Sequence, residues 1–397
     1  MIKTVTVVHY WAGCPKSVSS KWQRFLALVQ RCSHESWNNY LVLSKLPDNP
    51  ALSEPFIKAG CEIIIQPRSN GNFDLGSVWR TYKLVRNLKC DVFHCHNDHT
   101  SSLIGATLAK VPVRIWSSLA MSSYHRKLTQ PQGLHRLMLS TRISSLCTHR
   151  ILAISEDVRN ELINHGANEK RVEVVHIPVD VERFSMKPGN KIRHELGLNL
   201  SHIMITSIGH AVFLKGWDIA IKAFSKIQNL FPNARLVLVG STDDPGEVKF
   251  FNDLTELCEK YNVSDYVYFL GHRHDIPEIL KASDISILPS RSEGLGCALL
   301  EAMAAKLPCV AARAGGPSDV ITHGKNGFLF ERENSEQLVE CLTELIRDET
   351  LKAKIASHAF IRAQDFSMES YANKVFSIYQ SLLDSRKDNK CPASLES

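Results

Sequence analysis

The feature that most constrains the fold is a repeated alternation of short apolar, β-branched segments with segments of helical character. The strand-like segments of the first half are VTVVHY, YLVLS, CEIIIQP, DVFHCH, VRIWSS, RILAIS and VEVVHIP, and those of the second half are HIMITSIG, ARLVLVG, YVYFLG, ISILPS, PCVAARAG and GFLF. Such an alternation is typical of parallel sheets covered by helices. The sequence therefore predicts the α/β class, with two successive doubly wound units.

The length of 397 residues agrees with two domains, because a single hydrophobic core stops growing beyond about 250–300 residues. The break is expected near 181–200, where the apolar periodicity fades and Pro188 and Gly189 interrupt the chain. The last clear helix is predicted to bury one face, because apolar residues recur there at three-and-four spacing: Tyr371, Val375, Ile378 and Leu382. We predict two Rossmann-like domains followed by a terminal helix and a frayed tail, with the bounds 1–185, 186–365 and 366–397.

The composition excludes several classes of protein. The formal net charge is only +6 and no long basic run occurs, so we expect no nucleic-acid partner, while a weak attraction to anionic lipid stays open. The 11 cysteines are scattered without disulfide or metal spacing, which indicates reduced thiols of a cytoplasmic protein. No stretch reaches the roughly 20 apolar residues that a spanning helix needs. Any membrane contact would be peripheral, at the inner face.

Two carboxylates stand at a predicted strand-to-helix junction in the second half. The segment ISILPSRSEGLGCALLEAMAA contains Glu293 before the expected helix and Glu301 within it, with Gly294 and Gly296 in the loop between. Glycines and a helix start suit a phosphate, because backbone N–H groups can approach it there. The carboxylates would instead accept hydrogen bonds from hydroxyls, Glu301 from a ribose and Glu293 from the far end of the ligand. This combination describes a nucleotide sugar.

A second loop of the same domain supplies the cation that a diphosphate requires. In SIGHAVFLKGWDIAIKAF, a strand ends at Gly209 and Lys215 with Gly216 opens the next helix. Lys215 would neutralise the charge that accumulates on a departing diphosphate. The chain contains no Asp-x-Asp triplet, so we expect neither a carboxylate-held metal ion nor a cofactor.

These motifs resemble those of the group-one, family-four retaining glycosyltransferases of the GT-B fold, in which two Rossmann-like domains face each other across a cleft. The resemblance rests on GHAVFLKG, YFLGHRHDIPEILKASDISILPS, EGLG with LLEAMAAKLPCVAARAGGPSDVITHGKNGFLF, and ILAISEDVRNELINHGANEKRVEVVHIPVDVERF. It covers most of residues 85–335. It implies that the first domain binds the acceptor, the second the donor, and that the terminal helix crosses back to the first domain.

The resemblance also assigns residues. It implies that Lys215 meets the donor diphosphate, Glu301 the ribose and Glu293 the transferred sugar, with Lys215 and Glu293 as the catalytic pair. The expected donor-binding residues are Gly209, His210, Lys215, Gly216, Arg273, Glu293, Gly294, Leu295, Gly296 and Glu301. The expected acceptor-side residues are Gly13, His96, Asn97, Ser117 and His125.

Some positions depart from the family pattern. His210 stands where a basic residue often follows the first glycine of the diphosphate loop, and Gly13 is alone where a glycine-rich loop is usual. Ser117 and Ser118 occupy the place of a histidine often found after the fifth strand, and the sequence leaves open whether His125 replaces it.

Two motifs admit a plainer interpretation. The cluster HCHNDH offers His94, Cys95, His96 and His99 as metal ligands, but residues 94 and 96 share one face of a strand while 95 points away, and no distant ligand pair is evident. We therefore expect no metal there. The segment SVWRTYKLVRNLK is expected to be a sheet-covering helix with a basic outer face, with membrane docking as the alternative.

The sequence thus predicts a metal-independent, retaining hexosyltransferase that moves a sugar from a nucleotide diphosphate to an acceptor hydroxyl of a sugar or a lipid-linked sugar, in bacterial surface polysaccharide synthesis. One alternative is a nucleotide-sugar epimerase of the same fold, which would need no acceptor. Another is a nucleotide-sugar-binding subunit without turnover.

Overall fold

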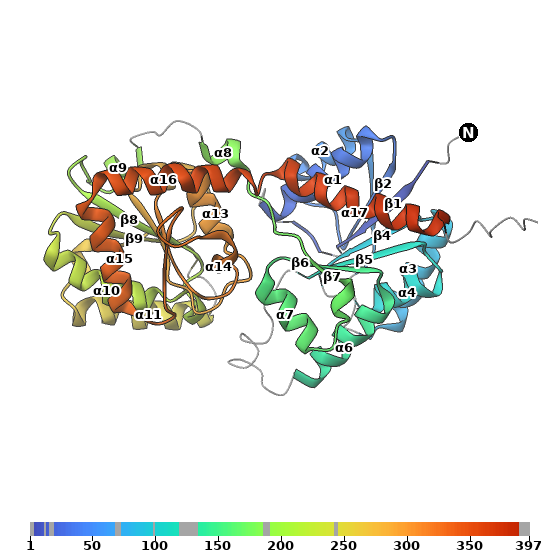
Figure 1. Cartoon of the computed structure of the whole chain (residues 1–397), viewed down its shortest axis with the longest axis horizontal. Coiled ribbons are helices and arrows are strands. Elements are labelled where there is room, and N and C mark those ends of the chain that lie inside the picture. The colour runs from blue at the N-terminus through green and yellow to red at the C-terminus, as the bar shows by residue number, and fades with distance from the viewer. Residues whose placement is uncertain are drawn as a thin grey trace, which may run out of the picture. The chain divides into compact units, whose positions relative to one another are not determined.

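A computed structural model of the chain describes residues 4–11, 13–15, 20–67, 73–97, 100–118, 134–185, 191–241 and 245–388. The chain divides into two compact units (Figure 1). The first unit consists of Met1–Pro178 with Met368–Ser397, and the second of Val179–Ser367. The predicted linker near 181–200 contains two short helices of the second unit, α8 (Val181–Ser185) and α9 (Lys191–Glu195).

The first unit is built on a seven-stranded sheet in the order β3-β2-β1-β4-β5-β6-β7, with parallel pairing throughout. Its strands are β1 (Thr6–Tyr10), β2 (Asn38–Leu43), β3 (Cys61–Ile65), β4 (Val92–His96), β5 (Val113–Ser118), β6 (Arg150–Ala153) and β7 (Val172–Val174). The strand order reverses between β1 and β4, so this pair is the topological switch point of the sheet. Both strands are buried along their whole length, as expected for parallel strands covered on two faces.

Helices cover both faces of this sheet (Figure 1). Its helices are α1 (Ser20–His34), α2 (Glu54–Lys58), α3 (Leu75–Asn87), α4 (Thr100–Leu108), α6 (Leu134–Cys147), α7 (Glu156–Asn164) and α17 (Met368–Asp388), with 3-10 turns η1 (Pro50–Leu52) and η3 (Glu169–Arg171). The helix α17 packs against α1. It places Tyr371, Val375 and Ile378 in one buried cluster with Val7 and Val92 of the sheet. The last helix of the chain therefore completes the core of the first unit.

The second unit repeats the plan with a six-stranded parallel sheet in the order β10-β9-β8-β11-β12-β13. Its strands are β8 (Ile203–Ile208), β9 (Ala234–Val239), β10 (Val267–Phe269), β11 (Ile285–Leu288), β12 (Cys309–Ala312) and β13 (Phe328–Phe330). Here the order reverses between β8 and β11, which makes that pair the second switch point. The prediction of two doubly wound parallel sheets is confirmed.

The remaining helices cover the second sheet. They are α10 (Trp217–Leu230), α11 (Pro245–Lys260), α12 (Ile276–Ala282), α13 (Cys297–Ala304), α14 (Pro317–Val320), α15 (Ser335–Arg347) and α16 (Glu349–Gln364), with 3-10 turns η4 (Phe213–Lys215) and η5 (Ser264–Tyr266). The helices α10, α11 and α15 share a buried cluster with the sheet, to which α10 contributes Trp217, Phe224 and Ile227. The opposite face is covered by α9 and α12, which contribute Ile192 and Ile279.

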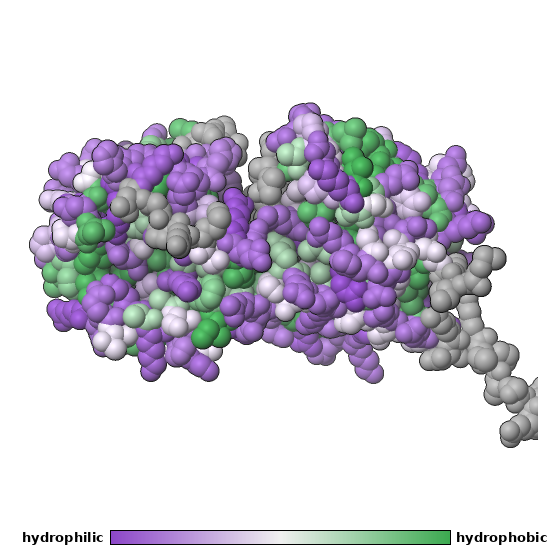
Figure 2. Space-filling view, turned by 90° about the horizontal axis from the view of Figure 1, so that it is seen from above, coloured by the Kyte–Doolittle hydropathy of each residue, from purple (hydrophilic) through white to green (hydrophobic). Residues whose placement is uncertain are grey.

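The surface of each unit is mainly polar on the face that Figure 2 shows, where hydrophobic residues gather only in separate patches. Among the helices that the structure describes, none combines the length and the apolar character needed to cross a bilayer.

Candidate functional site

The two loops that leave the second sheet at its switch point, with helix α13, carry the predicted donor residues except Arg273. In doubly wound folds, ligands bind beyond the carboxyl ends of the strands at such a point. The loop after β8 runs from Gly209 through η4 into α10, and the loop after β11 runs from Pro289 to Gly296 and into α13. The chain thereby brings together Lys215 and Glu293, which lie 78 positions apart in the sequence.

The Lys215–Glu293 contact is the centre of the site. The Lys215 Nζ atom lies 2.5 Å from Oε1 of Glu293 in a salt bridge. The hydroxyl of Ser290 donates a hydrogen bond of 2.8 Å to the same oxygen. The side chains of Lys215 and Glu293 are 25% and 10% exposed, so the pair is sheltered but still reachable by a ligand. The predicted catalytic pair is thus assembled in one place.

The turn that carries Lys215 depends on glycine. Gly216 has φ +66°, and a Cβ atom there would lie 2.0 Å from the carbonyl oxygen of Pro289. Only a residue without a side chain allows the start of α10 to approach the end of β11 this closely. Gly209 packs on the stem of Lys215, since a Cβ there would lie 3.1 Å from Lys215 Cδ. The glycines therefore fix where the ammonium group points.

The Glu293 loop is fixed by its backbone. The Glu293 N–H donates to Ala314 O at 2.7 Å, and Gly316 N–H donates to Glu293 O at 3.2 Å. A side chain at Gly316 would collide with the backbone of Gly294 and Leu295, at 2.4 Å and 2.3 Å. Sequence analysis did not assign Gly316 to the site. The two predicted loop residues Gly294 and Leu295 are thus held against the loop that follows β12.

The other end of this loop leads to Glu301. Gly296 has φ +91° and caps the start of α13, a conformation that favours glycine. Glu301 follows on α13 and is partly exposed. The predicted carboxylates therefore lie on the loop and on the helix that it enters, as the sequence motif indicated.

A buried arginine that sequence analysis missed ties the two loops together. Arg291 is 5% exposed. Its guanidinium pairs with Asp218 at 2.6 and 2.8 Å and with Glu333 at 2.7 Å, and it also donates to Phe213 O at 2.7 Å. Its backbone N–H donates to Leu214 O at 2.7 Å. Burial alone would lower the pKa of Arg291, but the hydrogen bonds to Asp218 and Glu333 raise it.

Arg291, which belongs to the Glu293 loop, therefore donates hydrogen bonds to carbonyl groups of the turn Phe213–Lys215 and fixes that turn. A planar guanidinium suits this task because it can donate several hydrogen bonds in fixed directions. The signal in the sequence was weak, since Arg291 and Asp218 look like ordinary surface charges until the fold brings them together.

His210 is also held by a partner that the sequence did not indicate. Its Nδ1 lies 2.9 Å from Oε1 of Glu247, and Ser241 Oγ donates to Oε2 of the same carboxylate at 3.0 Å. Glu247 is buried, whereas the side chain of His210 is 67% exposed. His210 therefore presents its ring to solvent on the loop after β8 while Glu247 fixes its orientation.

Arg273 has a different role from the other predicted donor residues. It forms a bidentate pair with Glu195 at 2.7 and 3.0 Å and a second one with Asp275 at 2.8 and 2.9 Å. Hydrogen bonds to Asp275 and Glu195 raise the pKa of Arg273 above its ordinary value. The structure therefore gives its guanidinium two carboxylate partners, and its contact with a donor stays a prediction.

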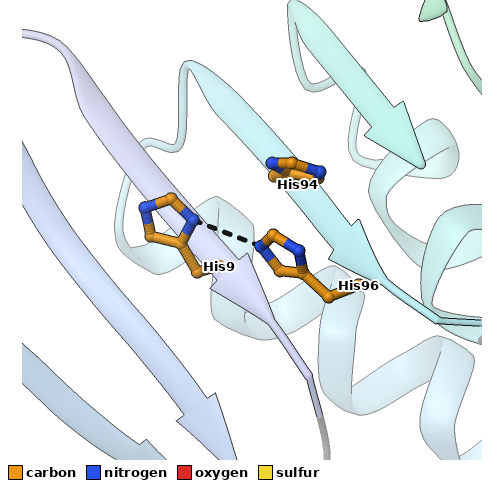
Figure 3. Close-up of side chains that lie close together, drawn as sticks. All are labelled: His9, His94 and His96. Atoms are coloured by element: carbon orange, nitrogen blue, oxygen red, sulfur yellow. Dashed lines mark hydrogen bonds between the residues drawn. The ribbon is translucent and has the colours of Figure 1, made fainter. Parts of the chain in front are cut away.

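At the switch point of the first sheet lies a cluster of three histidines (Figure 3). His9 on β1 pairs in register with His94 on β4, and His96 follows two residues later on the same strand. All three are completely buried. His9 Nδ1 lies 3.5 Å from His96 Nε2, and the rings of His94 and His96 lie 3.8 Å apart between centroids.

Burial keeps two of these imidazoles, those of His9 and His94, neutral. Burial lowers the pKa of His9 to about 4, although a hydrogen bond with Asn39 opposes the shift. Burial holds the pKa of His94 well below its ordinary value, and repulsion from His9 when that ring is protonated and from Arg24 adds to the shift. His94 Nδ1 lies 2.5 Å from Tyr379 Oη and Nε2 lies 2.7 Å from Ser117 Oγ.

The three histidines offer ligand atoms within 4.8 Å of one another, and His9 supplies the distant ligand that sequence analysis did not find. Neutral imidazole is the form that binds metal ions. However, both ring nitrogens of His94 already have partners, so a cation would have to displace Tyr379 or Ser117. The cluster therefore fits a packed polar core better than a metal site.

The predicted acceptor residues differ in exposure. His96 and Ser117 are buried, whereas Gly13 and Asn97 are partly exposed. Asn97 has φ +75°, a left-handed conformation that asparagine tolerates better than most residues. His125 lies outside the described residues. Of the four placed residues, Gly13 and Asn97 offer surface to an acceptor, and all four roles stay predictions.

Comparison with known sequences places both halves of the chain in glycosyltransferase families. The model of "Glycosyltransferase Family 4" matches residues 25–183, and that of "Glycosyl transferases group 1" matches residues 189–362. A UDP-Gal:alpha-D-GlcNAc-diphosphoundecaprenol alpha-1,3-galactosyltransferase of Escherichia coli is 28% identical over 285 residues, 70% of this chain and 72% of that protein. An N-acetyl-alpha-D-glucosaminyl L-malate synthase of Bacillus anthracis is 28% identical over 60% of this chain and 61% of its own length.

Solved structures show the same fold. HepE of Anabaena in complex with UDP has a TM-score of 0.78 at 20% identity and covers 95% of this chain and all of its own. WaaG, a glycosyltransferase involved in lipopolysaccharide biosynthesis, has a TM-score of 0.66 at 18% identity, covering 94% of this chain and 99% of its own. With the two family matches and the GT-B fold, these findings show that the chain belongs to the group 1, family 4 glycosyltransferases.

Proposed function

We propose that the chain is a retaining hexosyltransferase that moves a sugar from a nucleotide diphosphate sugar to an acceptor hydroxyl, without a metal ion. The observation that carries this proposal is the Lys215–Glu293 pair at the switch point of the second sheet. A cation and a carboxylate side by side suit a ligand in which an anionic diphosphate adjoins a polyhydroxylated sugar. UDP-glucose, with which HepE of Anabaena has been crystallised, is a ligand of this kind.

Lys215 is the group that meets the diphosphate. Its ammonium is paired with Glu293, and a diphosphate would offer it a stronger, doubly anionic partner. A positive group aimed at charge that develops in the transition state lowers the barrier most when water is excluded. The sheltered position of Lys215 therefore suits leaving-group stabilisation.

Glu293 is the group that orients the sugar. Its Oε1 accepts hydrogen bonds from Lys215 and Ser290, while within the described chain no hydrogen bond is found for Oε2. Oε2 can therefore accept from a sugar hydroxyl while Ser290 holds Oε1. Glu301, on the following helix, is assigned to the ribose, so that the two carboxylates hold opposite ends of one donor.

The reaction that follows is a front-face substitution. The bond between the anomeric carbon and the diphosphate oxygen breaks, and a bond from the same carbon to the acceptor oxygen forms on the same face. The acceptor proton passes to an oxygen of the departing diphosphate, whose remaining charge Lys215 and the backbone N–H groups at the starts of α10 and α13 stabilise.

The proposed setting is bacterial surface polysaccharide synthesis on a sugar or lipid-linked sugar acceptor. The Escherichia coli relative carries a diphosphoundecaprenol-linked sugar in its name, and WaaG is involved in lipopolysaccharide biosynthesis. In that setting this chain would act where a nucleotide sugar meets a growing surface glycan.

The test is to incubate the chain with UDP-sugars and to measure nucleotide release with and without sugar and lipid-linked acceptors. We expect acceptor-dependent release of nucleotide diphosphate and a product with the donor's anomeric configuration. Release of nucleotide with an epimerised free sugar and no need for an acceptor would identify an epimerase instead. Tight donor binding without any turnover would identify a binding subunit.

A further inference from the structure

The outer face of helix α3 in the first unit differs from an ordinary solvated helix face. The inner side of α3 buries Ser77, Thr81 and Val85. On the side toward α4, a Cβ atom at Gly105 would lie 2.5 Å from the backbone oxygen of Val78, so the two helices are in close contact (Figure 1). The outer side consists of the residues that we call the α3 face: Phe73, Leu75, Trp79, Lys83, Arg86 and Lys89.

The amino-terminal half of the α3 face is apolar. Leu75 is 83% exposed, Trp79 is 56% exposed and Phe73 is 50% exposed. Scattered apolar residues are normal on a protein surface, but neighbouring ones of this size mark an interaction site. The Trp79 ring is stacked on that of Tyr82, with 5.3 Å between centroids and 5° between planes. The indole is therefore held in place although most of it faces solvent.

The carboxyl-terminal half of the α3 face is basic. Lys83, Arg86 and Lys89 are exposed, and none of the three has an ion pair within the described chain. The segment 73–89 contains a single acidic residue, Asp74, which faces Arg80 at 3.4 Å and is therefore already neutralised. Lys83 also lies over the Trp79 ring, with its Nζ 5.0 Å from the centroid. The basic half thus adjoins the apolar half directly.

We propose that the α3 face docks the enzyme onto an anionic lipid bilayer. Trp79 and Leu75 would enter the boundary between headgroups and acyl chains, where tryptophan is favoured, and the basic side chains would meet the lipid phosphates. Uncompensated positive charge attracts anionic lipid headgroups. The same charge repels a second copy of this face, so the charge pattern favours lipid over self-association.

This inference extends the proposed function by naming a surface on which a lipid-linked acceptor would be met. It rests on the α3 face and does not require the donor site to be correct, because binding to lipid is measured without turnover. As expected, α3 buries one side and exposes basic residues on the other, and the structure adds large apolar residues at the start of that exposed side.

The test is co-flotation of the full chain with vesicles of phosphatidylcholine alone or of phosphatidylcholine mixed with phosphatidylglycerol. We expect binding to the anionic vesicles, a severalfold loss of binding at high salt because exposed charges are then screened, and little binding to the neutral vesicles. Equal binding to both vesicle types, or no binding to either, would overturn the proposal.

Two variants and two matched controls locate the surface. Leu75→Ser with Trp79→Ser, and separately Lys83→Gln with Arg86→Gln, should each lower binding to anionic vesicles at least tenfold. Leu146→Ser removes an equally exposed apolar residue on α6, at 76% exposure, and should leave binding unchanged. Lys58→Gln with Lys170→Gln removes the same charge elsewhere on the first unit and should have less than a twofold effect.

The substituted residues are exposed, so the variants should fold as the parent does, which circular dichroism checks. Transfer to a water-soluble acceptor should be the same in all of them. If the controls lower vesicle binding as much as the α3 variants do, binding follows total charge or hydrophobicity, and the α3 face is not the docking surface. A failure of transfer with normal vesicle binding would instead contradict the proposed function and leave this inference standing.

Discussion

The switch points of the two sheets carry opposite kinds of polar cluster. In the first sheet, His9, His94 and His96 lie within the strands and are completely buried, and burial keeps His9 and His94 neutral by lowering the pKa of each. In the second sheet, Lys215 and Glu293 lie on loops beyond the strands and are charged and partly exposed. Both clusters lie at the switch point of a doubly wound sheet. They differ in whether their residues lie within the strands or on the loops beyond the strand ends.

The physical reason for the difference is the cost of burying charge. Inside a parallel sheet covered on both faces, an unpaired ion would lose its hydration, so histidines there remain neutral and serve as hydrogen-bonded core. On glycine-containing loops past the strand ends, a lysine and a carboxylate can pair with each other and still exchange that partner for a ligand. The comparison predicts that changes in the second cluster act on turnover and changes in the first on stability.

The largest effect is expected for Lys215→Ala. Removal of one group that stabilises charge in the transition state lowers kcat by roughly 10²–10³-fold, or about 2.7–4 kcal/mol. Steady-state transfer kinetics measure it, and Lys222→Ala, at an exposed lysine on the following helix α10, is the control that should retain full activity. A folded Lys215→Ala enzyme with near-normal kcat would refute the role assigned to the pair.

The next effect concerns the stability of the first unit in acid. The pKa of His9 is about 4 in the folded chain and about 6.5 when unfolded. At this site the unfolded chain therefore binds more protons between these values, so the contribution of His9 to stability falls as the pH is lowered from 6.5 to 4 and levels off below that. A shift of this size corresponds to a loss of about 3 kcal/mol.

Urea unfolding followed by tryptophan fluorescence measures this loss, and the signal reports mainly on the first unit. Five of the six tryptophans lie in that unit, and Trp217 alone lies in the second. The His9→Gln variant should show a shallower decrease in stability between pH 6.5 and 4 than the parent. His34→Gln, at an exposed site on α1, is the control and should keep the parental slope. An unchanged slope in His9→Gln would show that His9 does not remain neutral in the folded state.

The two clusters also differ in how much of each could be predicted from the sequence. The strand-loop-helix motifs predicted the doubly wound fold and singled out Lys215 and Glu293, because glycine positions and charges beside a strand end are local signals. The sequence did not reveal His9 as the neighbour of His94, nor Arg291 and Glu247 as partners of the donor loops. These contacts join segments 37–85 positions apart, and only the order of strands brings them together.

A smaller effect separates the two glutamates of the charged cluster. Glu301→Gln should weaken the binding of the donor and of free nucleotide diphosphate alike, because both contain the ribose. The expected loss of binding free energy is about 1.5–3 kcal/mol, because a charged hydrogen bond becomes neutral. Glu293→Gln should lower transfer without weakening nucleotide diphosphate binding, because the diphosphate then no longer has to displace a carboxylate from Lys215. Calorimetry with UDP and steady-state rates distinguish the two. Equal loss of UDP affinity in both variants would show that they do not hold opposite ends of the donor.

The smallest effect is expected for Arg291→Lys, because lysine keeps the positive charge but cannot donate to Asp218, Glu333 and Phe213 O in the same fixed directions. We expect kcat to fall by about tenfold, or about 1.4 kcal/mol, with little change in KM. Arg313→Lys, at an exposed ion pair with Glu331, is the control and should be nearly neutral.

The decisive form of this last test is a double-mutant cycle. If Arg291 acts by holding the turn that carries Lys215, then Arg291→Lys should cost little further activity once Lys215 has been replaced by alanine, because the group that it positions is gone. Additive losses would show that Arg291 contributes independently of Lys215, through general stability or another contact. Non-additive losses would show that Arg291 is a buried positioning residue of the charged cluster in the second sheet. The histidine cluster of the first sheet needs no such residue, because its members lie on the strands themselves.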